Sequence, residues 1–171
     1  LTEHGSSRMR TVAWQRFLSL SDSWRNPLEW LPALKDRDQG VRKAVINSLR
    51  GRTGQISQSS MKSMVGSSYT DVRVFCAEAL TEAEQDAVDE FGFDLLIDEN
   101  LSVRASTIRS LGNRRQSGWL KIMERSLLDD EYVIQRAAMD CLLHDSLIGY
   151  SILKKYVAQN PLARISSIIR L

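Results

Sequence analysis

Residues that interrupt helices are scarce in this chain. Its 171 residues include only three prolines and nine glycines. Proline and glycine are the residue types least favourable in a helix interior, so the composition favours an all-helical protein. Long apolar runs are missing too, since none approaches the roughly 18 residues of a membrane-spanning segment. We therefore expect an all-α chain with no membrane span. We also expect a cytoplasmic location.

Residues that carry catalytic or metal chemistry are equally few. The chain has two histidines, His4 and His144, and two cysteines, Cys76 and Cys141. It contains no Cys-x-x-Cys, His-Glu-x-x-His, Gly-x-Ser-x-Gly or glycine-rich phosphate loop. The sequence therefore predicts no metal site, no cofactor and no catalytic residues, which indicates that the protein is not an enzyme.

Charge of either sign is not in large excess. The chain has 23 Lys and Arg against 21 Asp and Glu, a net charge of +2. It therefore has no global surplus of positive charge with which to hold DNA or an anionic membrane. The hydrophobic content of 43% is ample for one folded unit, so we expect residues 1–171 to form a single domain.

What the chain does contain is a repeated motif. An aliphatic anchor is followed at once by Arg and, eight positions after the anchor, by Leu or Phe. The motif begins six times, at intervals of 32, 31, 31, 31 and 29 residues. A fixed period in this range is typical of a solenoid, whose units bury their apolar faces against their neighbours. The anchors are Met9, Val41, Val72, Val103, Ile134 and Ala163.

Each motif predicts an amphipathic helix. At about 100° per residue, positions 0, 4, 8, 1 and 5 after the anchor form one contiguous arc. The arc is apolar, with small residues such as Ala13 and Cys76 at position 4, where another helix can approach closely. Cys76 and Cys141 belong to motifs two repeats apart, a separation of roughly 20 Å. We therefore predict two buried cysteines that form no disulfide.

The Arg that follows the anchor lies inside this apolar arc. A guanidinium cannot be buried there without hydrogen-bond acceptors. Suitable carboxylates, such as Asp36, Asp71 and Asp98, stand in the turn before each helix. We predict that they cap their own helix and accept hydrogen bonds from the Arg of an adjacent repeat, so that the Arg has a structural role. The arginines expected to hold the repeats together in this way are Arg42, Arg73 and Arg104.

A further helix fits between successive motifs. Apolar residues recur seven and eleven positions before the anchors, for example Leu34 and Trp30 before Val41. Trp14 also falls on a core position of its motif, so packing accounts for both tryptophans. Turn signals, such as the glycines at 51 and 54, follow the motifs. The predicted intervening helices are 27–35, 56–67, 83–97, 118–128 and 146–158.

The segment from Asp36 to Leu49 opens with Asp-x-Asp-x-x-Val-Arg and resembles a HEAT repeat. The likeness is to the short form of the repeat found in phycobilisome-lyase-like and many bacterial HEAT proteins. The segment from Asp98 to Leu111 matches this form as well. The resemblance covers nearly the whole chain. It implies a right-handed α-solenoid of about six stacked HEAT-like repeats with a period of about 31 residues, whose second helices line the concave side. It also implies binding, usually of protein, and no particular reaction.

The copies of the motif are not equally good. The first and sixth open with Met9 and Ala163 in place of a branched anchor, and the fifth has Gln135 in place of Arg. The last copy ends at Leu171, and the first leaves no room for an intervening helix of its own. Solenoids need polar capping repeats, yet Ile165 and Ile169 are expected on the outer side of the last helix. We therefore expect a fragment of a longer protein, or a chain whose ends are disordered or lost.

The side of each motif helix opposite the apolar arc is predicted to face solvent or a partner. Positions 2 and 6 after the anchor lie there, and the resemblance places them on the concave face. We predict a non-catalytic protein–protein interaction scaffold that binds a protein partner along this face. The expected partner-binding residues are Lys43, Asn47, Glu78, Arg109, Arg136 and Asp140.

Two alternatives to this function stay open. A nucleic-acid-binding protein would use the same helices, although Glu78 and Asp140 interleave with their cations. A HEAT-like lyase or glycosylase relative rests on the resemblance alone. The glycosylases have an Asp one helical turn beyond a Trp, and none of the four tryptophans here is followed by one. Nucleic-acid binding would also employ a basic rim in the turns after the motif helices, formed by Arg50, Arg52, Arg114 and Arg115.

One intervening helix is strongly acidic. From Glu82 to Glu99, both included, there are eight acidic residues and no basic one. The resemblance places this helix on the convex face. Two interpretations of the run stay open, a solvated helix surface and a docking patch.

Overall fold

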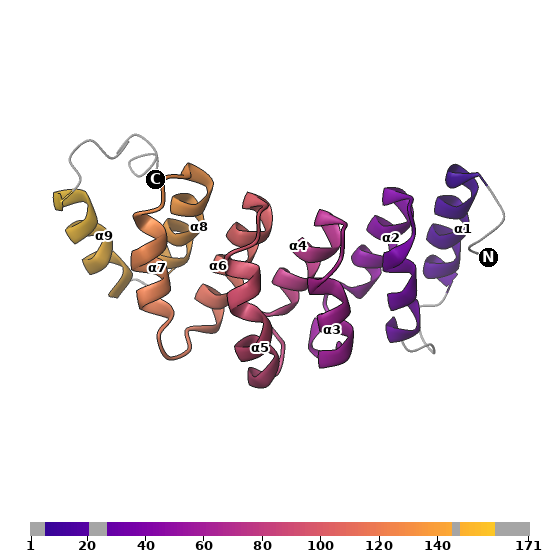
Figure 1. Cartoon of the computed structure of the whole chain (residues 1–171), viewed down its shortest axis with the longest axis horizontal. Coiled ribbons are helices and arrows are strands. Elements are labelled where there is room, and N and C mark those ends of the chain that lie inside the picture. Colours follow the sequence, from indigo (N-terminus) through magenta and orange to yellow (C-terminus); the bar gives the residue numbers. More distant parts are fainter. Residues whose placement is uncertain (1–5, 21–26, 145–147, 160–171) are drawn as a thin grey trace.

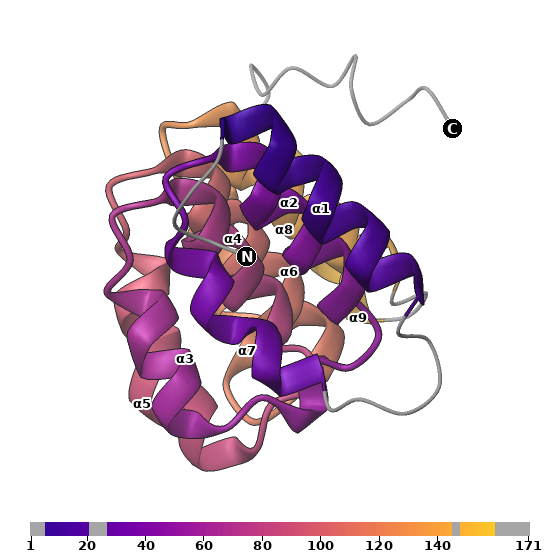
Figure 2. The same ribbon diagram turned by 90° about the vertical axis from the view of Figure 1, so that its right-hand side faces the viewer.

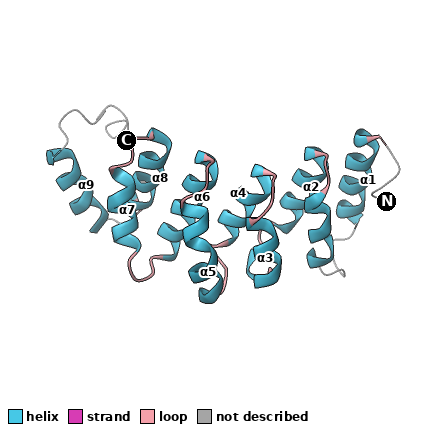
Figure 3. Ribbon diagram, viewed as in Figure 1, coloured by secondary structure: helices cyan, strands magenta, loops and turns pink. Residues whose placement is uncertain are grey.

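The computed structural model describes residues 6–20, 27–144 and 148–159 of the chain. Within these ranges all regular secondary structure is helical, and no strand occurs (Figure 3). The all-α prediction is therefore confirmed. The sixth motif, which begins at Ala163, lies outside the described residues together with Ile165 and Ile169.

Every described motif folds as a helix that begins two residues before its anchor. The residue one position earlier is the N-cap, and its side chain caps two of these helices, whereas Tyr69 and Glu131 at the same position make no side-chain cap hydrogen bond. Asp38 accepts a hydrogen bond from the Val41 N–H, and Asn100 accepts one from the Ser102 N–H. The motif helices are α1 (Ser7–Leu20), α2 (Gln39–Leu49), α4 (Thr70–Ala79), α6 (Leu101–Arg114) and α8 (Tyr132–Leu143).

The intervening helices also lie where the sequence predicts them. The first spans the predicted 27–35 but is a 3₁₀ helix, and Pro32 inside it has no N–H to donate to a regular α-helical ladder. A second short 3₁₀ turn, η2 (Thr53–Gln55), follows α2. The intervening helices are η1 (Pro27–Lys35), α3 (Gln58–Val65), α5 (Gln85–Leu96), α7 (Trp119–Leu127) and α9 (Ile148–Gln159).

The helices form two layers arranged along one long row (Figures 1 and 2). The motif helices α1, α2, α4, α6 and α8 follow one another in the first layer, and each packs against the next. The intervening helices form the second layer. The core runs between the layers, where the anchors Val41, Val72, Val103 and Ile134 are each at most 2% exposed. Met9, by contrast, is 68% exposed, since no helix of the described residues covers it.

A glycine allows α6 and α8 to approach closely. Gly112 in α6 faces Cys141 in α8, and a Cβ built on Gly112 would lie 2.5 Å from the Cys141 Sγ and 2.8 Å from its Cβ. Real carbon atoms do not approach so closely, so only glycine fits at this position. The spacing between α6 and α8 therefore depends on the absence of a side chain at residue 112.

Both cysteines are buried and form no disulfide, as the sequence predicts. Burial raises the pKa of the Cys76 thiol to about 12. Burial is also the main reason that the pKa of the Cys141 thiol rises to about 11. Because the thiolate is the reactive form of cysteine, both side chains act as small core residues rather than as nucleophiles at neutral pH.

Candidate functional site

A recurring hydrogen bond shapes the turn before the motif helices α2, α4, α6 and α8. Asp36, Ser67, Asp98 and Asp129 stand five residues before their anchors. Each accepts, through a side-chain oxygen, the backbone N–H two residues later, at 2.8, 3.2, 2.8 and 2.9 Å respectively. Side chains of this kind imitate a backbone turn. Sequence reasoning noted the carboxylates but missed this role, although their constant distance from the anchor is a usable signal.

In the same four copies, the side chain after the anchor reaches back to this turn. It donates a hydrogen bond to the backbone carbonyl six residues before it. The donors are Arg42 (2.8 Å), Arg73 (2.9 Å), Arg104 (2.9 Å) and Gln135 (2.6 Å). Gln135 therefore keeps the bond to the turn although it replaces the Arg of the other copies. The guanidinium or amide group thus stabilises the turn that precedes its own helix. This hydrogen bond was not predicted from the sequence.

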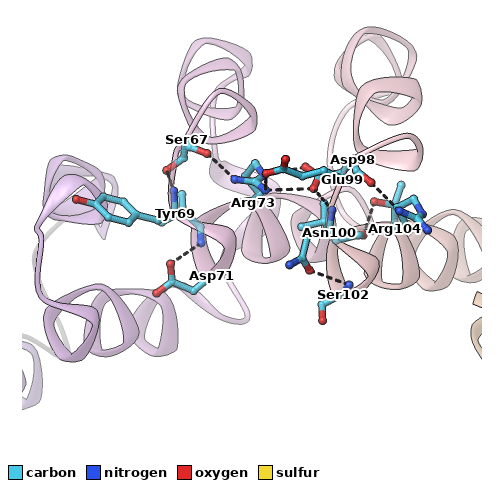
Figure 4. Close-up of polar contacts among 12 residues, drawn as sticks. Ser67, Tyr69, Asp71, Arg73, Asp98, Glu99, Asn100, Ser102 and Arg104 are labelled. Atoms are coloured by element: carbon cyan, nitrogen blue, oxygen red, sulfur yellow. Dashed lines mark hydrogen bonds and ion pairs between the residues drawn. The ribbon is translucent and has the colours of Figure 1, made fainter. Parts of the chain in front are cut away.

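Three arginines also bind a carboxylate of the next repeat. Figure 4 shows Arg73 between the carbonyl of Ser67 and the carboxylates of Asp98 and Glu99. The side chains of Arg73 and Asp98 are each only 10% exposed. The ion pairs between repeats are Arg10–Asp36 (3.3 Å), Arg42–Asp71 (3.1 Å) and Arg73–Asp98 (2.7 Å).

The predicted structural role is confirmed for Arg42 and Arg73. Arg42 has an additional contact, because its guanidinium lies over the Tyr69 ring, 3.8 Å from the ring centroid. Arg104 behaves differently, and its hydrogen bond goes to the carbonyl of Asp98 in its own turn (Figure 4). The guanidinium groups of Arg42 and Arg73 are thus engaged by groups within the protein.

The charge state of the central pair is fixed by its surroundings. Burial by itself raises the pKa of Asp98, but hydrogen bonds from Arg73 and from the Asn100 N–H, with nearby positive charge, bring the pKa below its ordinary value. The hydrogen bond with Asp98 raises the pKa of Arg73. Both groups therefore stay charged at neutral pH, and the pair serves as a structural link between repeats.

The predicted partner-binding residues come from four successive motif helices. Lys43, Asn47, Arg109 and Arg136 are exposed, and Glu78 and Asp140 are partly exposed. Position 2 of the motif does not face outward throughout. Ala105 of α6 occupies it and is only 1% exposed, because α6 packs against both α4 and α8. This exposed side of the motif helices, the outward face, is therefore narrower at α6, which contributes only Arg109 to the predicted partner-binding residues.

Several of these charges are already paired with one another. Arg50 bridges α2 and α4, since it contacts Glu78 at 3.3 Å and donates to the Asn47 Oδ1 at 3.3 Å. Arg136 pairs within α8 with Asp140 at 2.8 Å. Among the described residues, no hydrogen bond or ion pair engages the side chains of Lys43 and Arg109. These two cations are thus available to a partner.

The four predicted rim arginines do not form one accessible basic patch. Arg114 is half-buried, and its Nη1 donates to the carbonyls of Leu80 (2.8 Å) and Ala83 (2.6 Å) just after α4. Arg115 has a left-handed backbone, with φ of 50°, and donates to the carbonyl of His144 at 3.0 Å. Arg50 pairs with Glu78, as described above. Arg52 is exposed and makes no hydrogen bond or ion pair through its side chain to the described residues.

A groove of about 340 Å³ lies between η1 and α3. Its walls combine apolar side chains, among them Leu31 and Met64, with a row of serines from α3. Lys35 is the one titratable residue in its lining, so the lining by itself supplies no acid–base pair. In the part of the chain that the structure describes, no group of three or more His, Cys, Asp or Glu side chains could hold a metal ion.

None of the described helices combines the length and the apolar character needed to cross a membrane. No protein-family model matches the chain, and a search of curated proteins gives no match.

Proposed function

We propose that the chain is a right-handed α-solenoid of about six HEAT-like repeats that serves as a non-catalytic protein-interaction scaffold. Its partner binds along the exposed face of α2, α4, α6 and α8, which we place on the concave side of the solenoid. The proposal draws on the constant start of the motif helices, the recurring turn and the ion pairs between repeats. The observation that carries it is the pair of exposed cations, Lys43 and Arg109, on a face whose other charges are largely paired.

The framework behind this face is held together by hydrogen bonds and ion pairs of its own. In α2, α4, α6 and α8 the side chain after the anchor is hydrogen-bonded to its own turn. Arg10, Arg42 and Arg73 bind a carboxylate of the following repeat. A partner therefore does not have to order the backbone when it binds, which lowers the entropic cost of association. Because Lys43 and Arg109 are cationic, the fitting partner is a protein segment that presents acidic side chains.

A photo-crosslinking experiment tests the position of the partner. A photoreactive residue placed at Asn47, which leaves Lys43 and Arg109 in place, is expected to capture a protein from an extract of the source cells. The same residue at Lys121, which is exposed on α7 in the second layer, serves as the matched control. Lys43→Glu is expected to abolish capture at position 47 by repelling the acidic segment. Equal capture from position 121, or capture that Lys43→Glu does not change, would contradict the proposal.

Nucleic acid is the second candidate, because Lys43, Arg52 and Arg109 are exposed cations without a partner among the described residues. Three cations neutralise about three phosphates, so the logarithm of the association constant should fall with a slope of about −3 against the logarithm of the salt concentration. We expect only weak binding to duplex DNA at physiological salt. Tight binding that Lys43→Glu combined with Arg109→Glu abolishes would replace the scaffold proposal by the nucleic-acid one.

A further inference from the structure

Helix α5 carries large apolar side chains on its exposed surface. Phe93 is 65% exposed and Ile97, four residues later at the end of the helix, is 61% exposed. Residues four apart lie on the same side of a helix, so the two form one apolar patch. In Figures 1 and 2, α5 belongs to the second layer, away from the outward face of the motif helices. This surface is therefore separate from the one described above.

The fold does not require an apolar residue at this place. The positions that correspond to Phe93 in the neighbouring intervening helices, 31 residues away, are Lys62 in α3 and Glu124 in α7. Both are charged and exposed. The side chain of Phe93 is exposed to solvent, so burial in the core does not explain why this residue is apolar. Exposed apolar groups rimmed by polar residues are typical of interaction sites.

The rim of this patch is negatively charged. On the helical wheel, Asp86, Asp89, Glu90 and Asp94 fall with Phe93 and Ile97 in one arc of about 140°. All four carboxylates are exposed. The residues from Glu82 to Glu99 include no Lys or Arg.

Little positive charge from neighbouring helices offsets this rim. Glu90 contacts Lys62 at 3.9 Å, but Lys62 is itself 76% exposed and holds the pair only loosely. Asp89 accepts a hydrogen bond from the uncharged amide of Gln85 at 2.7 Å. Among the described residues, no ion pair engages Asp86 or Asp94.

We propose that the acidic surface of α5, centred on Phe93 and Ile97, is a docking site for a basic amphipathic helix of a protein partner. The apolar pair provides the anchor, and the carboxylates select Lys and Arg on either side of the partner's own apolar stripe. The same carboxylates repel DNA, RNA and anionic membranes, which leaves a cationic protein segment. The twelve residues of α5 extend over about 18 Å, enough to support a partner helix of three turns.

A peptide titration followed by NMR tests this proposal. The probe is a synthetic 18-residue amphipathic helix with Leu on one face and Lys and Arg on both flanks, and the controls are its scrambled form and a form with Glu in place of the cations. Saturable shifts confined to α5 and its neighbours are expected with the basic amphipathic peptide alone. Equal binding of the scrambled peptide, or shifts spread over the chain, would overturn the proposal.

Matched variants separate the apolar anchor from the charge. Phe93→Ser with Ile97→Ser is expected to weaken peptide binding by at least about tenfold, as is Asp86→Asn with Asp94→Asn. Tyr150→Ser removes another side chain that is 67% exposed, and it should leave the affinity unchanged. If the serine variant bound the peptide with undiminished affinity, the attraction would be electrostatic only, and the proposed docking site would be wrong. Self-association that depends on Phe93 in sedimentation analysis would instead assign the patch to a second copy.

This inference does not depend on the outward face of the motif helices. The serine variant of α5 should leave crosslinking from Asn47 unchanged, because the two surfaces lie in different layers. Conversely, Lys43→Glu should not alter binding of the basic peptide. Failure of one proposal is thus distinguishable from failure of the other.

Discussion

Replacing Arg73 by Met is expected to lower the free energy of unfolding by about 3–5 kcal/mol, because the change leaves a buried carboxylate without its partner. Arg73 donates to both oxygens of Asp98, at 2.7 and 3.2 Å, and to the carbonyl of Ser67 at 2.9 Å. Met fills a similar volume but can replace none of these bonds. Urea denaturation followed by circular dichroism measures the effect.

Arg109→Met is the matched control for this experiment. Arg109 is exposed and its side chain makes no hydrogen bond or ion pair to the described residues. Its replacement should change the free energy of unfolding by no more than about 0.5 kcal/mol. If Arg73→Met were as mild as Arg109→Met, Arg73 would not be a structural link between repeats.

The pH dependence of stability gives a second readout of the same pair. The folded-state pKa of Asp98 lies below its ordinary value of 3.8, so the ionised carboxylate contributes stability above that value and loses it as the pH falls through the folded pKa. In Arg73→Met, burial without the guanidinium should raise the pKa of Asp98 instead. The variant should then regain part of its stability as the pH falls from 7 towards 4, whereas the unmodified protein should not.

Gly112→Ala is expected to destabilise the protein although alanine is the better helix former. The added methyl would lie 2.5 Å from the Cys141 Sγ and 2.8 Å from its Cβ, so α6 and α8 have to separate. Overpacking of this kind costs about 1–3 kcal/mol, which exceeds the gain of about 1 kcal/mol in helix propensity. A melting temperature lower by several degrees is the expected result.

Gly66→Ala shows whether the position or the substitution matters. Gly66 ends α3 with φ of −77°, and an added Cβ meets nothing closer than the Lys62 carbonyl at 3.7 Å. Its melting temperature should be unchanged or slightly higher. In the Gly112→Ala background, Cys141→Ala removes the nearer of the two clashing atoms and should restore part of the loss. Strictly additive effects at 112 and 141 would rule out the proposed contact.

The repeat was readable from the sequence because it depends on local spacing. Positions separated by fixed numbers of residues fall on fixed sides of a helix, so the period and the apolar arc located the helices to within a few residues. The same logic required acceptors for Arg42 and Arg73, because a guanidinium in an apolar arc cannot stay unpaired. The sequence also predicted correctly that Cys76 and Cys141 are buried and unpaired.

The tertiary structure decided which groups meet. Arg73 forms an ion pair with Asp98, five residues before the next anchor. Arg42 instead pairs with Asp71, one residue before Val72, because the position five residues before Val72 is occupied by Ser67, which has no carboxylate.

Arg114, expected at a basic rim, instead binds the backbone carbonyls that follow α4. The exposure of Phe93 and the burial of Ala105 could not be predicted from the sequence either. Each of these outcomes depends on distances between residues of different repeats, and those distances are set by how closely the helices pack rather than by spacing along the chain.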